Sequence, residues 1–213
     1  MNFQLIDRES WKRKEYFDLY YNNLPCTYSM TANLDITSLL KTIHDKNLKL
    51  YPVMIYCISV IVNRHDEFRT SFDADGNIGV FDSVSPSFTV FHKNSETFSS
   101  IWTTFDENFS KFYASYLSDF EQYGEIEKLA AKPNAPSNLF NISSIPWTSF
   151  TGFNLNLAKG YDYLLPIFTM GKYFTENDKT MLPLSVQVHH GVCDGFHVSR
   201  LINKLQTLVQ EFS

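Results

Sequence analysis

The stretch that decides the fold leads from an apolar strand through a polar turn into a helix: Leu182-Pro183-Leu184-Ser185-Val186-Gln187-Val188-His189-His190-Gly191-Val192-Cys193-Asp194-Gly195. Up to Val188, bulky apolar residues alternate with smaller or polar ones, which is the period of a strand with one buried face. From 195 to 212, apolar residues recur at helical spacing along one face. The stretch therefore predicts a strand, a turn that carries two histidines, and an amphipathic terminal helix.

Helical and strand patterns alternate through the rest of the chain. The periodicities predict helices over 8–22, after Asp35, over 51–65 and over 105–123. They predict strands over 26–34, 88–92, 138–145, 152–157, 164–174 and 180–188, and a hairpin that joins 68–72 to 78–81. Several strands follow one another directly, so we expect an α/β fold, a two-layer α+β sandwich in which helices pack mainly on one face of a mixed sheet. Glycine and proline are sparse, with eight of each, and neither a linker nor a repeat is visible, so residues 1–213 should form a single domain.

The composition narrows the class of protein. The net charge of -5 argues against a nucleic-acid-binding protein, which usually carries a basic patch. The three cysteines are widely spaced and form no CxxC pair, which favours reduced thiols and a cytoplasmic location. The N-terminus lacks the apolar run of a signal peptide, and the longest apolar stretch, 53–62, is too short to span a bilayer. Aromatic residues make up 16% of the chain, which favours a thick core, an aromatic pocket or a subunit interface.

The two adjacent histidines differ in the face on which strand alternation places them. The alternation continues the apolar face to His190 and the polar face to His189. A histidine in a low dielectric stays neutral and can accept a proton, so His190 is the better candidate for a general base. The alternative is a core histidine that is hydrogen-bonded to the backbone.

The neighbouring polar residues leave other readings open. A metal site would use His189, His190, Asp194 and His197, but adjacent histidines on a strand diverge, and we expect no metal. Cys193 could pair with His190 as a nucleophile, yet small buried cysteines are common and a structural role is favoured. Asp194 could orient His190, cap the terminal helix or pair with an arginine.

The whole pattern His189-His190-Gly191-Val192-Cys193-Asp194-Gly195-Phe196-His197 resembles the HHxxxDG signature of coenzyme A-dependent acyltransferases. That signature occurs in chloramphenicol acetyltransferases, in dihydrolipoamide acyltransferase catalytic domains and in peptide-synthetase condensation domains. Further stretches resemble, in collinear order, the non-hexapeptide chloramphenicol acetyltransferases: 11–15, 24–26, 50–56, 88–91, 141–147, 153–156 and 168–173. Gly191 departs from the family pattern, in which alanine is usual, but it keeps a small residue there.

The resemblance implies a chloramphenicol acetyltransferase-like fold and an enzyme of antibiotic resistance. The expected reaction transfers acetyl from acetyl-CoA, as cosubstrate, to the C3 hydroxyl of chloramphenicol within a ternary complex. The resemblance further implies a homotrimer whose active sites lie at subunit boundaries. His190 of one subunit would face a drug pocket formed largely by its neighbour.

Site roles follow from the same resemblance. His190 matches the general base, whose reactive tautomer is held in relatives by a bond to its own backbone carbonyl. Ser143 matches the serine that stabilises the oxyanion, and Thr169 a threonine that supports the intermediate through water. Asp194 and Arg13 match an ion pair that holds the catalytic loop. Without the resemblance, Ser143 would read as an ordinary strand serine and Thr169 as a β-former.

Ligand contacts are implied for nine further residues. The drug pocket would include Tyr20, Cys26, Tyr28, Phe98, Phe153 and Leu155. The coenzyme A contacts would include Trp147, Lys172 and Tyr173. Each of these side chains could instead belong to the core or to the plain surface.

Two other functions remain open at this stage. A dihydrolipoamide acyltransferase core would share the fold and the base, but such enzymes carry N-terminal lipoyl domains, and this chain starts directly at the catalytic-type sequence. A non-catalytic trimer that only sequesters the drug would not need the five residues His190, Ser143, Thr169, Arg13 and Asp194 together.

Overall fold

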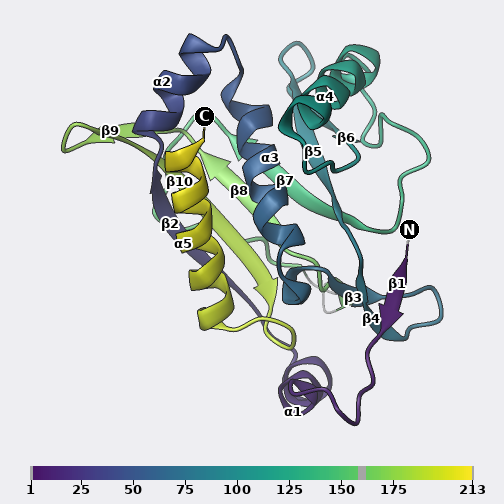
Figure 1. The fold of residues 1–213 in the computed structure, drawn as a ribbon. Coiled ribbons are helices and arrows are strands. Elements are labelled where there is room, and N and C mark those ends of the chain that lie inside the picture. Colours follow the sequence, from purple (N-terminus) through teal and green to yellow (C-terminus); the bar gives the residue numbers. More distant parts are fainter. Residues whose placement is uncertain (1, 158–161, 213) are drawn as a thin grey trace.

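A seven-stranded mixed sheet forms the centre of the structure, a computed structural model that describes residues 2–157 and 162–212 (Figure 1). Its strand order is β2 (Thr27–Asp35), β10 (Lys179–His189), β8 (Ile167–Gly171), β7 (Leu139–Ile145), β5 (Ser85–His92) and β6 (Thr97–Trp102), with β9 (Phe174–Glu176) paired to β10. The pairs β5–β7 and β7–β8 are parallel, and the other pairs are antiparallel. A smaller antiparallel sheet has the order β1 (Phe3–Leu5), β4 (Ile78–Phe81) and β3 (Thr70–Phe72).

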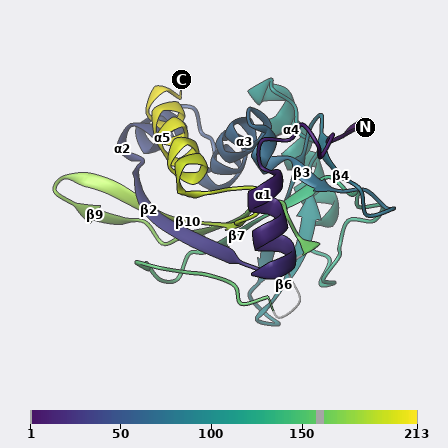
Figure 2. The same cartoon turned by 90° about the horizontal axis from the view of Figure 1, so that it is seen from below.

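Four helices cover one face of the large sheet, as the view from below shows (Figure 2). They are α2 (Thr37–Asp45), α3 (Leu50–Asn63), α4 (Phe109–Tyr123) and α5 (Gly195–Glu211). The short α1 (Lys14–Phe17) continues into a π-helix, η1 (Asp18–Asn23), and lies beyond the carboxyl end of β10 (Figure 1). A 3₁₀ turn, η2 (Asp66–Phe68), follows α3. The expected α/β fold with helices mainly on one face of a mixed sheet is confirmed.

The core lies between this helical layer and the sheet. Helix α5 buries Val198, Leu201, Leu205 and Val209, which recur every three or four residues. Helix α3 is buried almost throughout, because α4 and α5 flank it on the sheet. Each fully buried aliphatic side chain contributes about 1.5–3 kcal/mol to stability. Packing against the sheet therefore decides which face of α5 is buried.

The N-terminal helix is shorter than the predicted span 8–22. The Asp7 carboxylate accepts hydrogen bonds from Glu9 N (3.2 Å) and Ser10 Oγ (2.7 Å), which forms a turn where the helix was expected. Such side-chain bonds compete with the helical backbone bonds and delay the helix until Lys14.

The segment 152–157 is not a strand, contrary to the prediction. Side chains of β10 hold its backbone in place of a neighbouring strand. Gln187 Oε1 accepts from Leu155 N (2.7 Å), Gln187 Nε2 donates to Leu155 O (3.0 Å), and Ser185 Oγ donates to Phe153 O (2.5 Å). The segment thus crosses the polar face of β10, and its apolar side chains gave a false strand period.

Other strand predictions need smaller corrections. The hairpin of β3 and β4 is confirmed. The predicted strand 164–174 divides into β8 and β9, because Lys172 N turns away to donate to Thr148 O (2.9 Å). Strands β1 and β6 were not predicted. The turn before β6 uses Glu96 at φ 54° rather than a glycine, so it carries no familiar hairpin signal.

Candidate active site

The turn between β10 and α5 is tied down by backbone hydrogen bonds. His189 O accepts from Val192 N (3.2 Å) and Cys193 N (3.1 Å), so the chain turns back immediately after β10. His190 N donates to Cys26 O (2.9 Å), which ties the turn to the segment before β2. These bonds therefore hold the backbone of both histidines in place at the carboxyl end of β10.

The burial of the two histidines is the reverse of the sequence prediction. His189 is 1% exposed, whereas His190 is only partly buried. Strand alternation was extended one residue too far, because β10 ends at His189 and His190 already belongs to the turn. Burial lowers the pKa of His189 to about 4, with a smaller contribution from neighbouring His190. Its Nδ1 accepts from Gly191 N (3.0 Å), so His189 is a neutral part of the turn's framework.

The buried His189 predicts a pH dependence of stability. Its folded-state pKa of about 4 lies below the ordinary 6.5, so the unfolded chain binds a proton first as the pH falls. The contribution of this group is fully present above pH 6.5 and is lost progressively down to pH 4. We expect the free energy of unfolding to fall by about 3 kcal/mol over that window.

Denaturant unfolding at fixed protein concentration, from pH 7 to pH 4, measures this effect. In His189→Asn the amide oxygen can take the place of Nδ1 without titrating, so the pH slope should be flatter than in the wild type. Equal slopes in the two proteins would refute the assignment to His189.

His190 is oriented by three neighbours. Its Nδ1 lies 3.1 Å from Cys193 O, a geometry that places the proton on Nδ1 and leaves Nε2 as the basic nitrogen. Tyr20 stacks on the imidazole with ring centres 3.9 Å apart, and Tyr28 meets it edge-on at 5.3 Å. The backbone carbonyl of His190 itself, the partner that the resemblance implies, accepts from Arg13 Nη2 (3.2 Å).

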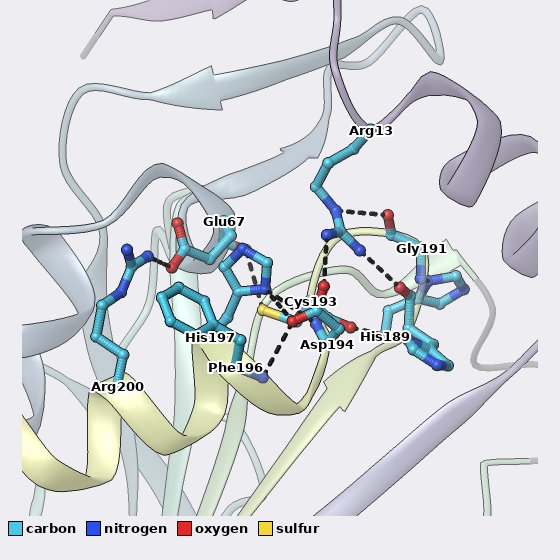
Figure 3. Close-up of polar contacts among 10 residues, drawn as sticks. Arg13, Glu67, His189, Gly191, Cys193, Asp194, Phe196, His197 and Arg200 are labelled. Carbon is cyan, nitrogen blue, oxygen red and sulfur yellow. Dashed lines mark hydrogen bonds and ion pairs between the residues drawn. The ribbon is translucent and has the colours of Figure 1, made fainter.

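Arg13 clamps the turn from outside (Figure 3). Its Nη1 donates to Asp194 Oδ2 (2.9 Å) and its Nε donates to Gly191 O (3.3 Å). Burial alone would raise the pKa of Asp194, but the hydrogen bonds and charges of Arg13 and His197 together outweigh it and lower that pKa. Asp194 also caps α5 by accepting from Phe196 N (3.1 Å). Asp194 therefore caps the helix and also pairs with an arginine, which are two of the three roles left open for it.

The Arg13–Asp194 pair leads to a first activity prediction. Asp194→Asn keeps an acceptor for Phe196 N but removes the charge that pairs with Arg13, so the turn should lose its fixed position. We expect kcat to fall by about tenfold, the equivalent of one charge-assisted hydrogen bond.

A matched control is Asp35→Asn, which breaks the ion pair to Lys179 at the far end of β10 (3.1 Å). Its turnover should equal that of the wild type. Comparable turnover in Asp194→Asn and wild type would contradict the role of the pair.

A second ion pair fixes the turn from the helical side. Arg200 Nη2 on α5 donates to Glu67 Oε1 on η2, and Cys193 Sγ lies 3.8 Å from Glu67 O (Figure 3). Cys193 is fully buried, and burial raises the pKa of its thiol well above the usual value. A buried protonated thiol is a poor nucleophile, which agrees with a structural role.

Ser143 and Thr169 form a separate polar pair on the sheet. They are register partners on β7 and β8, and their hydroxyl oxygens lie 3.0 Å apart. Ser143 opens into a cavity of about 1080 Å³ whose walls are mainly apolar. Phe98, Trp147 and Leu155 line the same cavity. The cavity has the size and the lining of a small-molecule site.

The other predicted ligand contacts are divided between two places. Cys26 and Tyr28 line a second cavity of about 550 Å³, which Leu155 and Gln187 also border, while Tyr20 stacks on His190. Phe153 packs on Phe150, with ring centres 5.6 Å apart. Lys172 and Tyr173 follow β8 and are exposed, next to the segment after β7 that carries Trp147.

Within one chain the structure does not bring His190 to Ser143. Thr169, the partner of Ser143, pairs with Ser185 on β10, four residues before His189. At about 3.3 Å per residue, this offset amounts to about 13 Å along the strand. Strand β8 also lies between β7 and β10, so Ser143 and the histidines are too far apart to act on one bond in a single chain.

Several residues at the site escaped the sequence analysis. Gln187, which holds the segment 153–155, carried a weak signal as a large polar residue on the polar face of β10. The Glu67–Arg200 pair joins residues 133 positions apart and carried none. Among residues 2–157 and 162–212, no group of three His, Cys, Asp or Glu side chains is placed to hold a metal ion. In the same part of the chain no helix is long and apolar enough to cross a membrane.

Comparison with known protein sequences matches the whole length of the chain to one family. The family profile of chloramphenicol acetyltransferases matches residues 1–206. A chloramphenicol acetyltransferase of Clostridium perfringens is 56% identical over 209 residues, which are 98% of this chain and 99% of that protein. One of Campylobacter coli is 56% identical, with 99% of this chain and 100% of that protein covered. Chloramphenicol acetyltransferase 3 of Escherichia coli is 49% identical, with 98% and 97% covered.

Solved structures share the fold at lower identity. A chloramphenicol acetyltransferase structure superposes with a TM-score of 0.87 at 21% identity and covers 98% of this chain and all of that chain. A dihydrolipoamide acetyltransferase of Azotobacter vinelandii gives a TM-score of 0.67 at 20% identity, with 92% of this chain and 86% of that chain covered. At these identities the likeness concerns the fold alone.

Proposed function

The chain belongs to the chloramphenicol acetyltransferase family and is an acyltransferase, and from this premise we propose that it acetylates the C3 hydroxyl of chloramphenicol with acetyl-CoA. The observation that carries the mechanism is the contact between His190 Nδ1 and the backbone carbonyl of Cys193. The imidazole Nδ1 faces Cys193 O at 3.1 Å, so Nε2 is the nitrogen that can take a proton.

In the proposed reaction His190 acts as the general base. Nε2 takes the proton of the drug hydroxyl while the hydroxyl oxygen attacks the thioester carbonyl, so one C–O bond forms. An alcohol is a poor nucleophile until this proton is removed. The clamp from Arg13 and the stacked ring of Tyr20 support the role, because they hold the imidazole in one orientation.

Ser143 stabilises the oxyanion that develops on the thioester oxygen. A hydroxyl donor near that oxygen lowers the barrier because it is oriented before the charge appears. Thr169 keeps the Ser143 hydroxyl in place at 3.0 Å and supports the intermediate through water. When the C–S bond breaks, the His190 imidazolium returns its proton to the departing thiolate. No acyl-enzyme is needed, which agrees with the burial of Cys193.

The two substrates would occupy different surfaces. The apolar cavity with Phe98 and Leu155 suits the nitrophenyl ring and the dichloroacetyl group of the drug, and Cys26, Tyr28, Tyr20 and Phe153 would complete its wall across the boundary. Trp147, Lys172 and Tyr173 would bind coenzyme A. Trp147 is 59% exposed and Tyr173 is 50% exposed, so both rings are available for an adenine, and the exposed Lys172 for a phosphate.

We place each active site between two subunits of a homotrimer. The separation of His190 from Ser143 within one chain supports this arrangement, since a neighbouring copy can supply the missing partner. The 54% exposure of Phe98 beside the large cavity supports it as well, because exposed apolar patches mark interfaces. Each chain would contribute residues 1–213 as one acetyltransferase domain. The three free cysteines fit a reducing cytoplasm, where inactivation of the drug would confer resistance.

The test follows the free thiol released from acetyl-CoA with and without chloramphenicol. The proposal expects thiol release that depends on the drug, with the acetyl group on the C3 oxygen as read by NMR of the product. Release that requires dihydrolipoamide instead would support an acyltransferase core of another class and refute the drug as substrate. Release without any acceptor would indicate a thioesterase, and drug binding without release would indicate sequestration.

A further inference from the structure

We propose that Gln187 is a positioning residue that sets the affinity for chloramphenicol, because its side-chain amide holds Leu155 in the wall of the drug cavity. The inference rests on the proposed function in that it takes the large apolar cavity as the place of the drug. Gln187 lies on β10, on the face of the sheet opposite that of Val186 and Val188, which pack in the helical core. The segment 152–157 crosses this open face, beneath the sheet in Figure 2.

The amide of Gln187 makes the two hydrogen bonds that a neighbouring strand would make. Its Oε1 accepts from Leu155 N (2.7 Å), and its Nε2 donates to Leu155 O (3.0 Å). Ser29 Oγ on β2 donates to the same Oε1 (3.4 Å). Since a backbone N–H only donates and a carbonyl only accepts, the amide has one orientation here. It therefore fixes both the position and the direction of the Leu155 backbone.

Burial makes the amide and the segment depend on each other. Gln187 is 6% exposed although it stands on the open face of the sheet. A buried polar group that loses its partner costs about 1–3 kcal/mol, so the amide has no favourable alternative to the backbone of Leu155. Two residues earlier on both segments, Ser185 Oγ donates to Phe153 O (2.5 Å). These side chains hold 153–155 alongside β10.

The side chain of Leu155 is part of the wall of both cavities. It lines the cavity of about 1080 Å³ that contains Ser143, and also the cavity of about 550 Å³ that contains Cys26 and Tyr28. Leu155 is 40% exposed, so packing fixes its side chain only in part, and its position follows that of its backbone. The amide of Gln187 thus sets where this wall stands.

Gln187→Met should weaken the binding of the drug without changing the chemical step. Methionine has a similar length and makes neither hydrogen bond to Leu155. We expect the Kd and the KM for chloramphenicol to rise by about tenfold, the equivalent of one to two hydrogen bonds. The kcat and the KM for acetyl-CoA should stay at the wild-type values, because the lost bonds hold a wall and no reacting group.

The chain offers a matched control in Gln206→Met. Gln206 makes the same pair of bonds to another backbone, accepting from Asp35 N (2.8 Å) and donating to Asp35 O (2.9 Å). Asp35 pairs with the start of β10, at the end of the strand away from the histidines. Gln206→Met should therefore bind the drug as the wild type does, although it loses an equal number of hydrogen bonds.

A double-mutant cycle with Leu155→Ala separates positioning from a general loss of stability. The Kd for chloramphenicol is measured by equilibrium dialysis without acetyl-CoA, so turnover does not enter. If Gln187 acts through Leu155, Gln187→Met should raise the Kd much less in the Leu155→Ala background than in the wild type. A wild-type Kd in Gln187→Met, or effects of the two substitutions that simply add, would overturn the proposal.

Methyl NMR of Leu155 in the free protein separates this inference from the proposed function. In Gln187→Met the Leu155 methyl signals should shift and broaden, and in Gln206→Met they should match the wild type. Unchanged Leu155 signals in Gln187→Met would overturn the inference even if the protein acetylates the drug. If those signals respond but the wild type does not bind chloramphenicol, the amide still sets the cavity wall and the proposed function fails.

Discussion

His190→Ala is expected to lower kcat for chloramphenicol acetylation by about 10²–10⁴-fold, because the drug hydroxyl loses the base that takes its proton. The KM for chloramphenicol should change little, since the walls of the large apolar cavity are untouched. The loss comes from chemistry rather than folding: His190 is only partly buried, and its backbone N–H would still donate to Cys26 O. The measurement is thiol release under single-turnover conditions, with circular dichroism to check the fold.

The control is the neighbouring residue. His189→Asn changes the buried histidine, which is neutral and bonded to Gly191 N, so it should affect stability far more than the chemical step. If His189→Asn removed the chemical step while His190→Ala preserved it, the assignment of the base would be wrong.

Ser143→Ala is expected to lower kcat by about 10²–10³-fold, the usual cost of one oxyanion donor. The reason is specific to the transition state, since the thioester carbonyl gains its negative charge only when it is attacked. Binding of both substrates should stay close to that of the wild type. Thr169→Val provides the comparison: it removes the hydroxyl 3.0 Å from Ser143 Oγ, and its smaller effect should show in kcat alone. A Ser143→Ala enzyme with wild-type kcat would mean that another group stabilises the oxyanion.

Local periodicity made the strand–turn–helix unit predictable. β10 and α5 follow from alternation and from helical spacing, since both are decided by which face packs on the core. The same reasoning gave the wrong burial for His189 and His190, at the point where β10 ends. Alternation holds only while the strand continues, and hydrogen bonds from Val192 N and Cys193 N to His189 O end it at that residue. The burial of His189 therefore depends on the turn, which the strand pattern does not encode.

Contacts between distant segments escaped prediction for a different reason. Glu67 and Arg200 meet because η2 and the start of α5 lie side by side, and neither local sequence indicates the other. The segment 152–157 had the composition of a strand, yet side chains of β10 satisfy its backbone. The resemblance named Arg13 and Asp194 correctly as close partners, but the carbonyl that accepts from His190 Nδ1 could be identified only from the folded turn.

The central claim is that His190 of one chain and Ser143 of another act on the same bond. Co-expression of His190→Ala and Ser143→Ala chains, each with its own affinity tag, tests it most directly. If the site lies between chains, every purified mixed trimer has both native residues at one of its three boundaries, so about a third of wild-type activity should return. If both residues act within one chain, every site in the mixture lacks one of them. Mixed trimers as inactive as the two parents would contradict the account.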